Sequence, residues 1–265
     1  MSEPTRDIRP LLVVDGVSVR FGGIIALDGV SFDIAPGQIC GLIGPNGAGK
    51  TTLFNCLSRL YDCQAGRITY DGTELNKQPI HLIAGMGLGR TFQNLALFRT
   101  MSVQQNVEVG RHCRTQTGFL ANALRGSGVR REERSSQAKV DEMIDLLDLK
   151  SVAHVRVADL PFGTQKRVEF ARALAAEPRL LLLDEPAAGL NHQEVDELGT
   201  LIRRIRDKLS ITVLLVEHHM SMVMSISDKV VALNFGKKIA EGTPAQVQAH
   251  PDVIAAYLGT GDDTP

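Results

Sequence analysis

The feature that most limits the possible folds is a glycine-rich stretch, Gly44 to Thr51, which reads GPNGAGKT. It matches the pattern G-x4-G-K-[ST] at every fixed position. The apolar run 39–43 precedes it, and we expect a helix to begin near Lys50 and continue through Leu60. A glycine-rich turn that matched by chance would not have these flanks. The order of strand, loop and helix therefore predicts a phosphate-binding loop.

The residue types of this stretch suit a nucleoside triphosphate with Mg²⁺. Glycines let the backbone approach phosphate oxygens, and the following helix presents its positive end to the anion. Lys50 is long enough to reach the β- and γ-phosphates, and the Thr51 hydroxyl can ligate Mg²⁺. The expected cofactors are therefore ATP and Mg²⁺. The expected nucleotide-binding residues of the loop are Gly44, Pro45, Asn46, Gly47, Ala48, Gly49, Lys50, Thr51 and Thr52.

The rest of the chain predicts an α/β fold. Alternation over 17–21 predicts a half-buried strand, and the apolar runs 180–183 and 211–216 predict strands buried on both faces. A helix face between 195 and 209 separates the last two runs. Strands that alternate with helices indicate a mostly parallel sheet covered on both sides.

The middle of the chain has a different pattern. Val140, Met143, Ile144 and Leu147 recur at helical spacing, and 94–159 as a whole predicts a helical subdomain inserted into the α/β core. The stretch 114–137 is polar, with basic residues and several glycines, and is expected to contain a surface loop. Towards the end of the chain, Thr243-Pro244 has the form of a helix start.

Two acidic residues follow the run 180–183. Asp184 at the end of a buried strand is the Walker-B arrangement, in which the carboxylate holds the water shell of the metal. Glu185 is placed to polarise the attacking water as a general base. An apolar strand that ends in Asp-Glu is common by itself, but the phosphate loop favours the functional interpretation.

A histidine pair follows the next predicted strand. His218 would lie at the same sheet edge, where it could contact the γ-phosphate. A lone histidine is more often an ordinary surface residue, and His218 is selected only by the order of the motifs. His219 is expected to be incidental. The catalytic candidates are therefore Glu185, His218 and Lys50.

Composition excludes several other classes of protein. Lys and Arg number 29 against 30 Asp and Glu, so no overall charge points to nucleic acid. The four cysteines form no CxxC pair, which favours reduced thiols over zinc or redox sites. No signal peptide and no apolar run of roughly 20 residues is apparent.

Together these motifs resemble the nucleotide-binding subunit of an ABC transporter, over about residues 11–259. The resemblance implies a P-loop, RecA-like core with a mostly parallel sheet, an N-terminal antiparallel β region and an inserted helical subdomain. It also implies that Gln93 senses Mg²⁺ and that Phe21 stacks on adenine, although Phe21 could instead be a core aromatic. Metal contacts would come from Thr51, Gln93 and Asp184. The D-loop corresponds to 188–191, with Asn191 where Asp is commoner.

The family's signature segment corresponds to Leu160 to Arg167, reading LPFGTQKR where LSGGQ is usual. Leu160, Gly163 and Gln165 are the expected nucleotide contacts. Pro161 replaces a serine whose hydroxyl contacts the γ-phosphate of the other subunit, and proline offers neither hydroxyl nor N–H. A simple loop before a helix at 165–176 is the alternative interpretation.

The resemblance further implies an assembly. Two ATPase subunits, identical or paralogous, would meet head to tail on two transmembrane permeases, with a solute-binding protein acting indirectly and no nucleic acid. The location would be the cytoplasmic face of the inner membrane. Expected divisions of the single ABC ATPase domain (1–265) are a core at 11–93 and 160–240, helices at 94–159 and a helical tail at 241–265.

Finer resemblance points to importers of branched-chain and other hydrophobic amino acids. It rests on 20–23, 89–94, 185–189, 242–244 and 251–258. Of the paired ATPases in those importers, the chain is similar to the longer, LivG-type subunit. Alternatives are the ATPase of a urea or amide importer, that of lipopolysaccharide export, or a catalytically weak half of a heterodimer. A soluble ABC translation factor would carry two sets of motifs, and this chain carries one.

Overall fold

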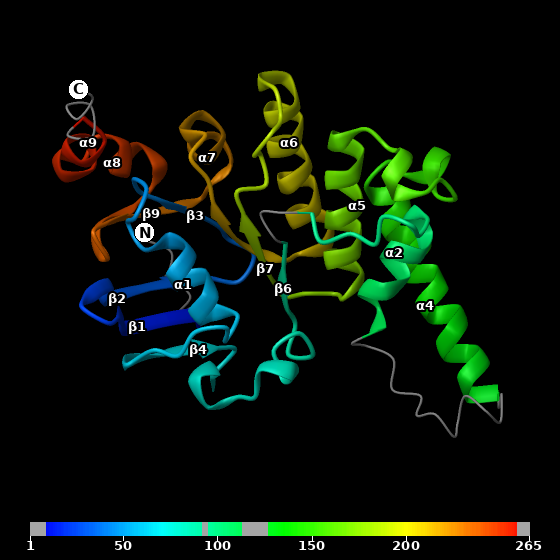
Figure 1. Ribbon diagram of the computed structural model, residues 1–265, viewed down its shortest axis with the longest axis horizontal. Coiled ribbons are helices and arrows are strands. Elements are labelled where there is room, and N and C mark those ends of the chain that lie inside the picture. Colours follow the sequence, from blue (N-terminus) through cyan, green and yellow to red (C-terminus); the bar gives the residue numbers. More distant parts are fainter. Residues whose placement is uncertain (1–8, 92–94, 113–126, 259–265) are drawn as a thin grey trace, which may run out of the picture.

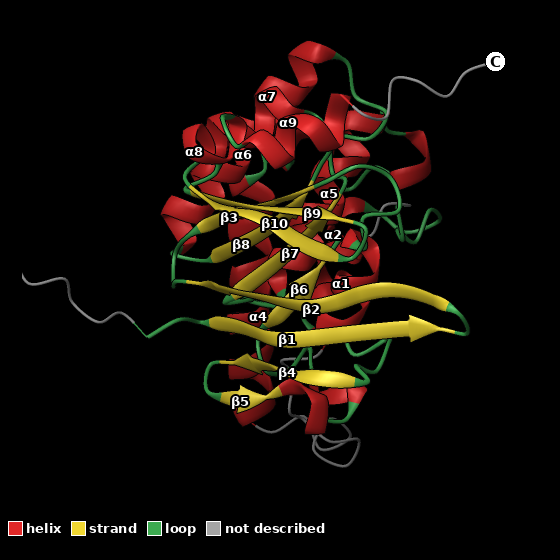
Figure 2. Cartoon of the chain, turned by 90° about the vertical axis from the view of Figure 1, so that its left-hand side faces the viewer, coloured by secondary structure: helices red, strands yellow, loops and turns green. Residues whose placement is uncertain are grey.

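The computed structural model describes residues 9–91, 95–112 and 127–258. Two β-sheets lie one above the other, and most of the later helices cover the outer face of the larger sheet (Figure 2). A group of helices extends from one side of this body (Figure 1). The predicted α/β class and the antiparallel region are both confirmed.

The larger sheet has six described strands in the order β10-β9-β3-β8-β7-β6. β3, β6, β7, β8 and β9 run parallel, and β10 pairs with β9 in the antiparallel sense. The bounds of its strands are β3 Ile39–Ile43, β6 Leu88–Arg90, β7 Leu180–Asp184, β8 Thr212–Val216, β9 Lys229–Asn234 and β10 Lys237–Gly242.

Alternate side chains of the central strands enter two separate cores, because successive residues of a strand point to opposite faces. Leu181 and Leu183 of β7 join a core with the helices of the outer face, whereas Leu180 and Leu182 join a core facing the smaller sheet. Burial on both faces explains why these strands are continuous apolar runs.

The smaller sheet is antiparallel, in the order β2-β1-β4-β5. Its strands are β1 Leu12–Phe21, β2 Ile24–Ile34, β4 Ala65–Tyr70 and β5 Thr73–Glu74. The helix after the glycine-rich stretch, α1 Lys50–Leu57, is buried between the two sheets through Leu53 and Phe54 (Figure 2). It ends earlier than the expected Leu60, because Arg59 adopts a left-handed backbone conformation with φ 59°.

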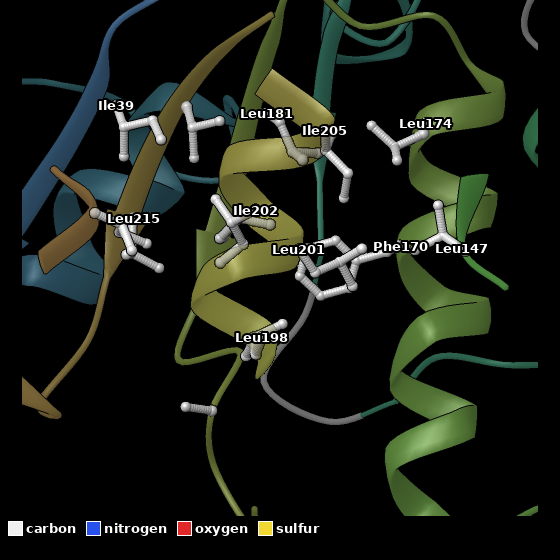
Figure 3. Close-up of a cluster of buried hydrophobic side chains, with 14 of the residues drawn as sticks. Ile39, Leu147, Phe170, Leu174, Leu181, Leu198, Leu201, Ile202, Ile205 and Leu215 are labelled. Carbon is white, nitrogen blue, oxygen red and sulfur yellow. The ribbon is translucent and has the colours of Figure 1, made fainter. Parts of the chain in front are cut away.

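The extending group contains α2 Val103–Gly110 and α4 Ser127–Leu146, and α5 Phe162–Ala175 packs against both (Figure 1). The predicted periodic residues from Val140 to Leu147 are all buried. Figure 3 shows Leu147, Phe170 and Leu174 near Leu201 and Ile205 of α6 His192–Leu209, so one apolar core joins this group to the sheet.

In the stretch 114–137, the described part from Ser127 onward belongs to α4, and the part before it, where a surface loop is expected, lies outside the described residues. Another helix boundary differs from expectation. α5 begins at Phe162 instead of residue 165, with Pro161 at its N-cap. The N–H groups at the start of a helix have no carbonyl partner within the helix. A proline at this position, which lacks an N–H, therefore costs the helix no hydrogen bond.

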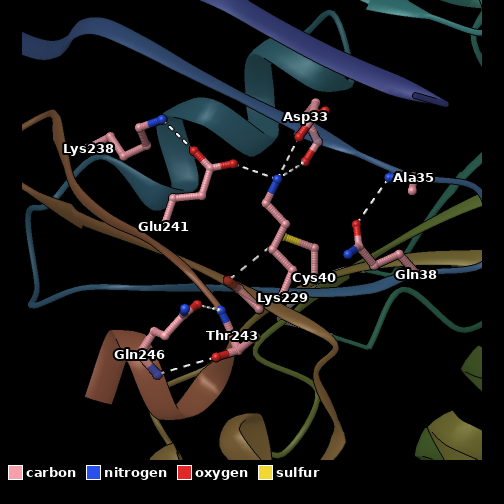
Figure 4. Close-up of polar contacts among 10 residues, drawn as sticks. Asp33, Ala35, Gln38, Cys40, Lys229, Lys238, Glu241, Thr243 and Gln246 are labelled. Carbon is pink, nitrogen blue, oxygen red and sulfur yellow. Dashed lines mark hydrogen bonds and ion pairs between the residues drawn. The ribbon is translucent and has the colours of Figure 1, made fainter. Parts of the chain in front are cut away.

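The chain ends in short helices, α7 Met220–Ile226, α8 Pro244–Gln248 and α9 Pro251–Leu258. The predicted helix start at Thr243 is confirmed by a capping box with Gln246 (Figure 4). Short 3₁₀ turns lie at Leu75–Lys77, Ile80–Leu82, Lys150–Val152 and Val157–Asp159. Of the helices in the described ranges, none has both the length and the apolar character to cross a bilayer.

An ion-pair cluster holds β9 to its neighbours (Figure 4). The Lys229 ammonium lies 2.6 Å from Asp33 of β2 and 2.5 Å from Glu241 of β10. Burial would lower the pKa of Lys229, but hydrogen bonds to both carboxylates outweigh it and raise the pKa. The cluster thus stabilises the strand that lies beside the glycine-rich loop.

Candidate active site

The glycine-rich loop fits its surroundings so closely that two glycines have no room for a side chain. A Cβ on Gly44 would lie 2.2 Å from the carbonyl oxygen of Leu233, and one on Gly49 would lie 2.5 Å from that of Ala26. Gly49 also has φ +101°, a conformation that favours glycine. The loop is therefore held by β9 and β2.

Lys50 is folded back over its own loop. Its ammonium donates hydrogen bonds to the carbonyl oxygens of Gly44, at 2.6 Å, and Pro45, at 2.9 Å. Burial lowers the pKa of Lys50, while the charges of Glu185 and Asp184 act in the opposite direction. Thr51, the next residue, is exposed, as a metal or phosphate contact must be.

Three neighbouring parallel strands bring the predicted motifs to one sheet edge. β3 runs into the phosphate loop, β8 into Glu217-His218, and β7 into Asp184 and Glu185. Because carboxyl ends of parallel strands share an edge, the motifs meet although they are far apart in sequence. Glu185 has a left-handed backbone, φ 47°, and its N–H donates to the carbonyl of Val216. This bond joins the end of β7 to the end of β8.

Arg90, which the sequence argument quoted only as part of a matching stretch, is ion-paired with Asp184. Its Nη2 lies 2.8 Å from Asp184 Oδ2, and both side chains are about nine-tenths buried, 10% and 8% exposed. Its Nη1 donates to Asn55 Oδ1 and Ser58 Oγ, both at 3.0 Å. Arg90 therefore ties β6, β7 and α1 together at the acidic side of the site.

A second unassigned residue, Glu217, orders the histidine segment. Its buried carboxylate accepts N–H groups of Ala187 at 2.6 Å, His218 at 3.1 Å and His219 at 3.4 Å. The His218 side chain itself is 59% exposed and its ring lies 4.6 Å from that of His219. Glu217 thus fixes the backbone of the histidine segment relative to that of the Glu185 turn.

Tyr257 of α9 also contacts the loop. Burial raises the pKa of Tyr257, and a hydrogen bond with the backbone of Gly44 opposes that rise. The ring packs against the core that contains Ile43 and Ala232. A residue near the chain's end therefore supports the start of the phosphate loop, which no local pattern could have indicated.

Phe21, the predicted adenine contact, has a ring that is only partly exposed. Phe21 ends β1 and is 46% exposed, so it is not a core aromatic. Its ring meets Tyr61 edge to face, with centroids 5.1 Å apart. Gln93, the other residue taken from the family resemblance, lies outside the described residues.

The signature segment, Leu160 to Arg167, forms the N-terminus of α5. Leu160 is buried, Gly163 lies in the first turn, and the Gln165 amide donates to the Leu160 carbonyl at 2.8 Å. Phe162 is 45% exposed and its ring covers Gly189 of the D-loop. The segment thus lies at the start of α5, whereas Gly44–Thr52 leads into α1. The two glycine-containing stretches therefore open two different helices.

The donor set at the sheet edge fits Mg²⁺. Asp184 offers a carboxylate and Thr51 an exposed hydroxyl, and Mg²⁺ prefers such hard oxygen ligands together with phosphate oxygens.

Comparison with known proteins agrees with this geometry. The profile of the ABC transporter family matches residues 27–188, which include the loop, the signature segment and Asp184-Glu185. The chain belongs to the ABC transporter family. A second profile, that of the branched-chain amino acid ATP-binding cassette transporter, matches residues 237–263 of this ABC protein.

The ABC protein is also similar to curated and solved proteins along nearly its whole length. It is 45% identical to the high-affinity branched-chain amino acid transport ATP-binding protein BraF of Pseudomonas aeruginosa, covering 95% of this chain and 98% of that one. It is 42% identical to LivG of Escherichia coli K12, with the same coverage. The crystal structure of an ATP-binding cassette in its ADP conformation superposes with a TM-score of 0.81 and 26% identity, covering 94% and 99% of the two chains.

Proposed function

We propose that this chain is the ATP-hydrolysing subunit of an ABC importer for branched-chain and other hydrophobic amino acids. The observation that carries the proposal is the meeting of the phosphate loop, Asp184-Glu185 and His218 at one edge of three adjacent parallel strands. Such a constellation positions a nucleotide, a metal and a water together, which is most of what phosphoryl transfer requires.

Each group has a distinct role in this proposal. The loop amides and Lys50 bind the phosphates, and Lys50 exchanges its bonds with the Gly44 and Pro45 carbonyls for phosphate oxygens. Thr51 and Asp184, with Gln93, would hold Mg²⁺, which would supply positive charge against the phosphates. Glu185 accepts a proton from the attacking water, and His218 contacts the γ-phosphate. Phe21 stacks on adenine.

The second half of the site comes from another ATPase subunit. The exposed N-terminus of α5, with Gly163 in its first turn, suits a phosphate approached from outside the chain. Two such subunits on two permeases would close on ATP and open after hydrolysis at the cytoplasmic face of the membrane. ATP drives this change only if it binds the closed state better than the open one.

The transported solute is assigned from the relatives and from the C-terminal match at residues 237–263. Direct contact with the solute is not expected of an ATPase subunit, so its site cannot identify the solute. The assignment therefore rests on similarity along 95% of the chain.

The test is reconstitution of the chain with its membrane partners in liposomes. Each candidate solute-binding protein is added with leucine, isoleucine, valine, urea or a short amide, and ATP hydrolysis is measured. We expect stimulation by the branched-chain amino acids. Stimulation by urea or an amide alone would reject the solute assignment, and hydrolysis absent in every mixture would reject the ATPase itself.

A further inference from the structure

The acidic side of the site contains a cation that the proposed mechanism does not use. Arg90 ends β6 and its guanidinium lies against Asp184, with both groups almost fully buried. Burying two charges is costly unless they are paired and hydrogen-bonded in good geometry. The pair therefore needs a reason beyond the joining of two strands.

We propose that Arg90 is a positioning residue for the metal site: it holds Asp184 in the orientation that receives the water shell of Mg²⁺. This inference rests on the proposed function, in which Asp184 serves the metal.

The geometry leaves one carboxylate oxygen available. Arg90 Nη2 bonds Oδ2 of Asp184, at 2.8 Å, so this bond does not occupy Oδ1. The guanidinium cannot follow a moving carboxylate, because Nη1 is fixed by Asn55 of α1 and by Ser58, the C-cap residue of that helix. Its Cζ also lies over the Phe54 ring, 5.7 Å from the centroid. A guanidinium held at both ends fixes the carboxylate in one rotamer.

Lys50 explains why this fixing is needed. Its ammonium lies close enough to Glu185 and Asp184 for both charges to raise its pKa against the effect of burial. A carboxylate without Arg90 would be a buried charge free to turn towards Lys50, which would draw the ammonium from the loop. Arg90 thus keeps the Asp184 carboxylate, which would serve the metal, away from the Lys50 ammonium, which would bind phosphate.

The experiment measures Mg²⁺-dependent nucleotide binding instead of turnover. In a Glu185→Gln background, which prevents hydrolysis, a fluorescent ATP analogue is titrated with and without Mg²⁺. For Arg90→Gln we expect the Mg²⁺ concentration for half-maximal binding to rise about tenfold, the size of one charge-assisted hydrogen bond. Binding of the analogue without Mg²⁺ should stay within about twofold.

Arg111→Gln is the matched control. Arg111 is 11% exposed, like Arg90, and pairs with Glu177 at 2.8 Å, but Glu177 is 46% exposed. Arg111 is the C-cap residue of α2 in the helical region. It should leave both titrations unchanged. Arg90→Lys should restore part of the Mg²⁺ affinity, and Ser58→Ala, which removes only one anchor of Arg90, should raise the Mg²⁺ requirement by about threefold.

The outcomes separate the two proposals. An equal loss of binding with and without Mg²⁺ in Arg90→Gln, or an unchanged Mg²⁺ requirement in a variant that keeps its melting temperature, would overturn the positioning role alone. A Glu185→Gln protein with intact Arg90 that binds no nucleotide would overturn the proposed function instead.

Discussion

The phosphate loop and the signature segment both place a glycine-containing stretch at the start of a helix, yet they are built differently. Gly44, Ala48 and Lys50 are buried and contact β9, β2 and α9. Pro161 and Phe162 are exposed. The loop is held in place by contacts within the chain, whereas the signature segment is an exposed surface whose complement we expect on another subunit. Substitutions in the first should therefore damage the isolated chain, and substitutions in the second only the assembly.

The largest expected effect is a loss of turnover on substitution of Glu185, which lies at the same sheet edge as the phosphate loop. Glu185→Gln keeps the shape of the side chain but cannot accept the proton of the attacking water. We expect turnover by the reconstituted transporter to fall about 10²–10⁴-fold, the usual contribution of a general base. ATP binding should remain, because the loop and Lys50 are untouched.

The measurement is phosphate release at saturating ATP, beside nucleotide binding by filter assay. Glu194→Gln, which changes an acidic residue of the α6 capping box near Gly163, is the control and should hydrolyse within a few-fold of the parent. Turnover that survives Glu185→Gln would remove the general-base assignment.

A pair of glycine substitutions tests the comparison directly. In Gly49→Ala, the new methyl would meet the Ala26 carbonyl and the Leu27 side chain in a left-handed conformation, so we expect a loss of about 3 kcal/mol in unfolding free energy. In Gly163→Ala, the methyl meets only Glu194 Oε1, at 3.3 Å, and alanine favours helix, so stability should change by less than about 1 kcal/mol.

Urea unfolding of the isolated chains gives the first comparison, and ATPase activity of the assembled transporter gives the second. Gly163→Ala should lose activity only in the assembly, where its methyl would face the nucleotide of the other subunit. If Gly163→Ala unfolds as easily as Gly49→Ala, the signature segment is also held by close packing within the chain.

The difference between the two regions also explains what could be predicted from sequence. The loop, the strand before it and Asp184-Glu185 are local patterns, so they can be located from the sequence, and the strands and the helix that flank them are confirmed. Arg90 and Asp184 are 94 residues apart, and Tyr257 contacts Gly44 only through the packing of α9. Such pairs leave no periodic signal. The early start of α5 was missed because a proline normally ends a helix pattern, whereas here it stands at the N-cap.

A smaller effect concerns the ion pairs that support each region. Burial would raise the pKa of Glu241, but hydrogen bonds from Lys229 and Lys238 lower it below 4.5. A carboxyl with a lowered folded pKa stabilises the fold above its unfolded value and loses that contribution as the pH falls. Lys229, with a raised pKa, contributes fully below 10.5 and loses its contribution as the pH rises through the folded value. The cluster therefore stabilises the fold most fully at pH values between 4.5 and 10.5, where the carboxylate and the ammonium are both charged.

Glu241→Gln should lower the unfolding free energy at pH 7 by about 1–2 kcal/mol, between the values for exposed and buried pairs. The difference from the parent should shrink below pH 4.5. Asp145→Asn removes an exposed pair with Lys150 in the helical region and should have no measurable effect. Equal effects of the two substitutions, measured by denaturation across pH, would contradict the contrast.

The smallest effect is expected at Pro161, the residue that departs most from the family pattern. Its carbonyl accepts the first helical hydrogen bond, from Gln165 N at 3.0 Å, and a serine there could do the same. Serine would add a helix cap and a hydroxyl towards the other subunit, while proline restricts the unfolded chain, so stability should change by less than about 1 kcal/mol. Activity of the assembled Pro161→Ser transporter should be equal or up to about threefold higher, as one weak hydrogen bond allows. A large loss of activity with unchanged stability would mean that proline itself shapes the contact with the other subunit, and that the exposed surface is more specialised than its openness indicates.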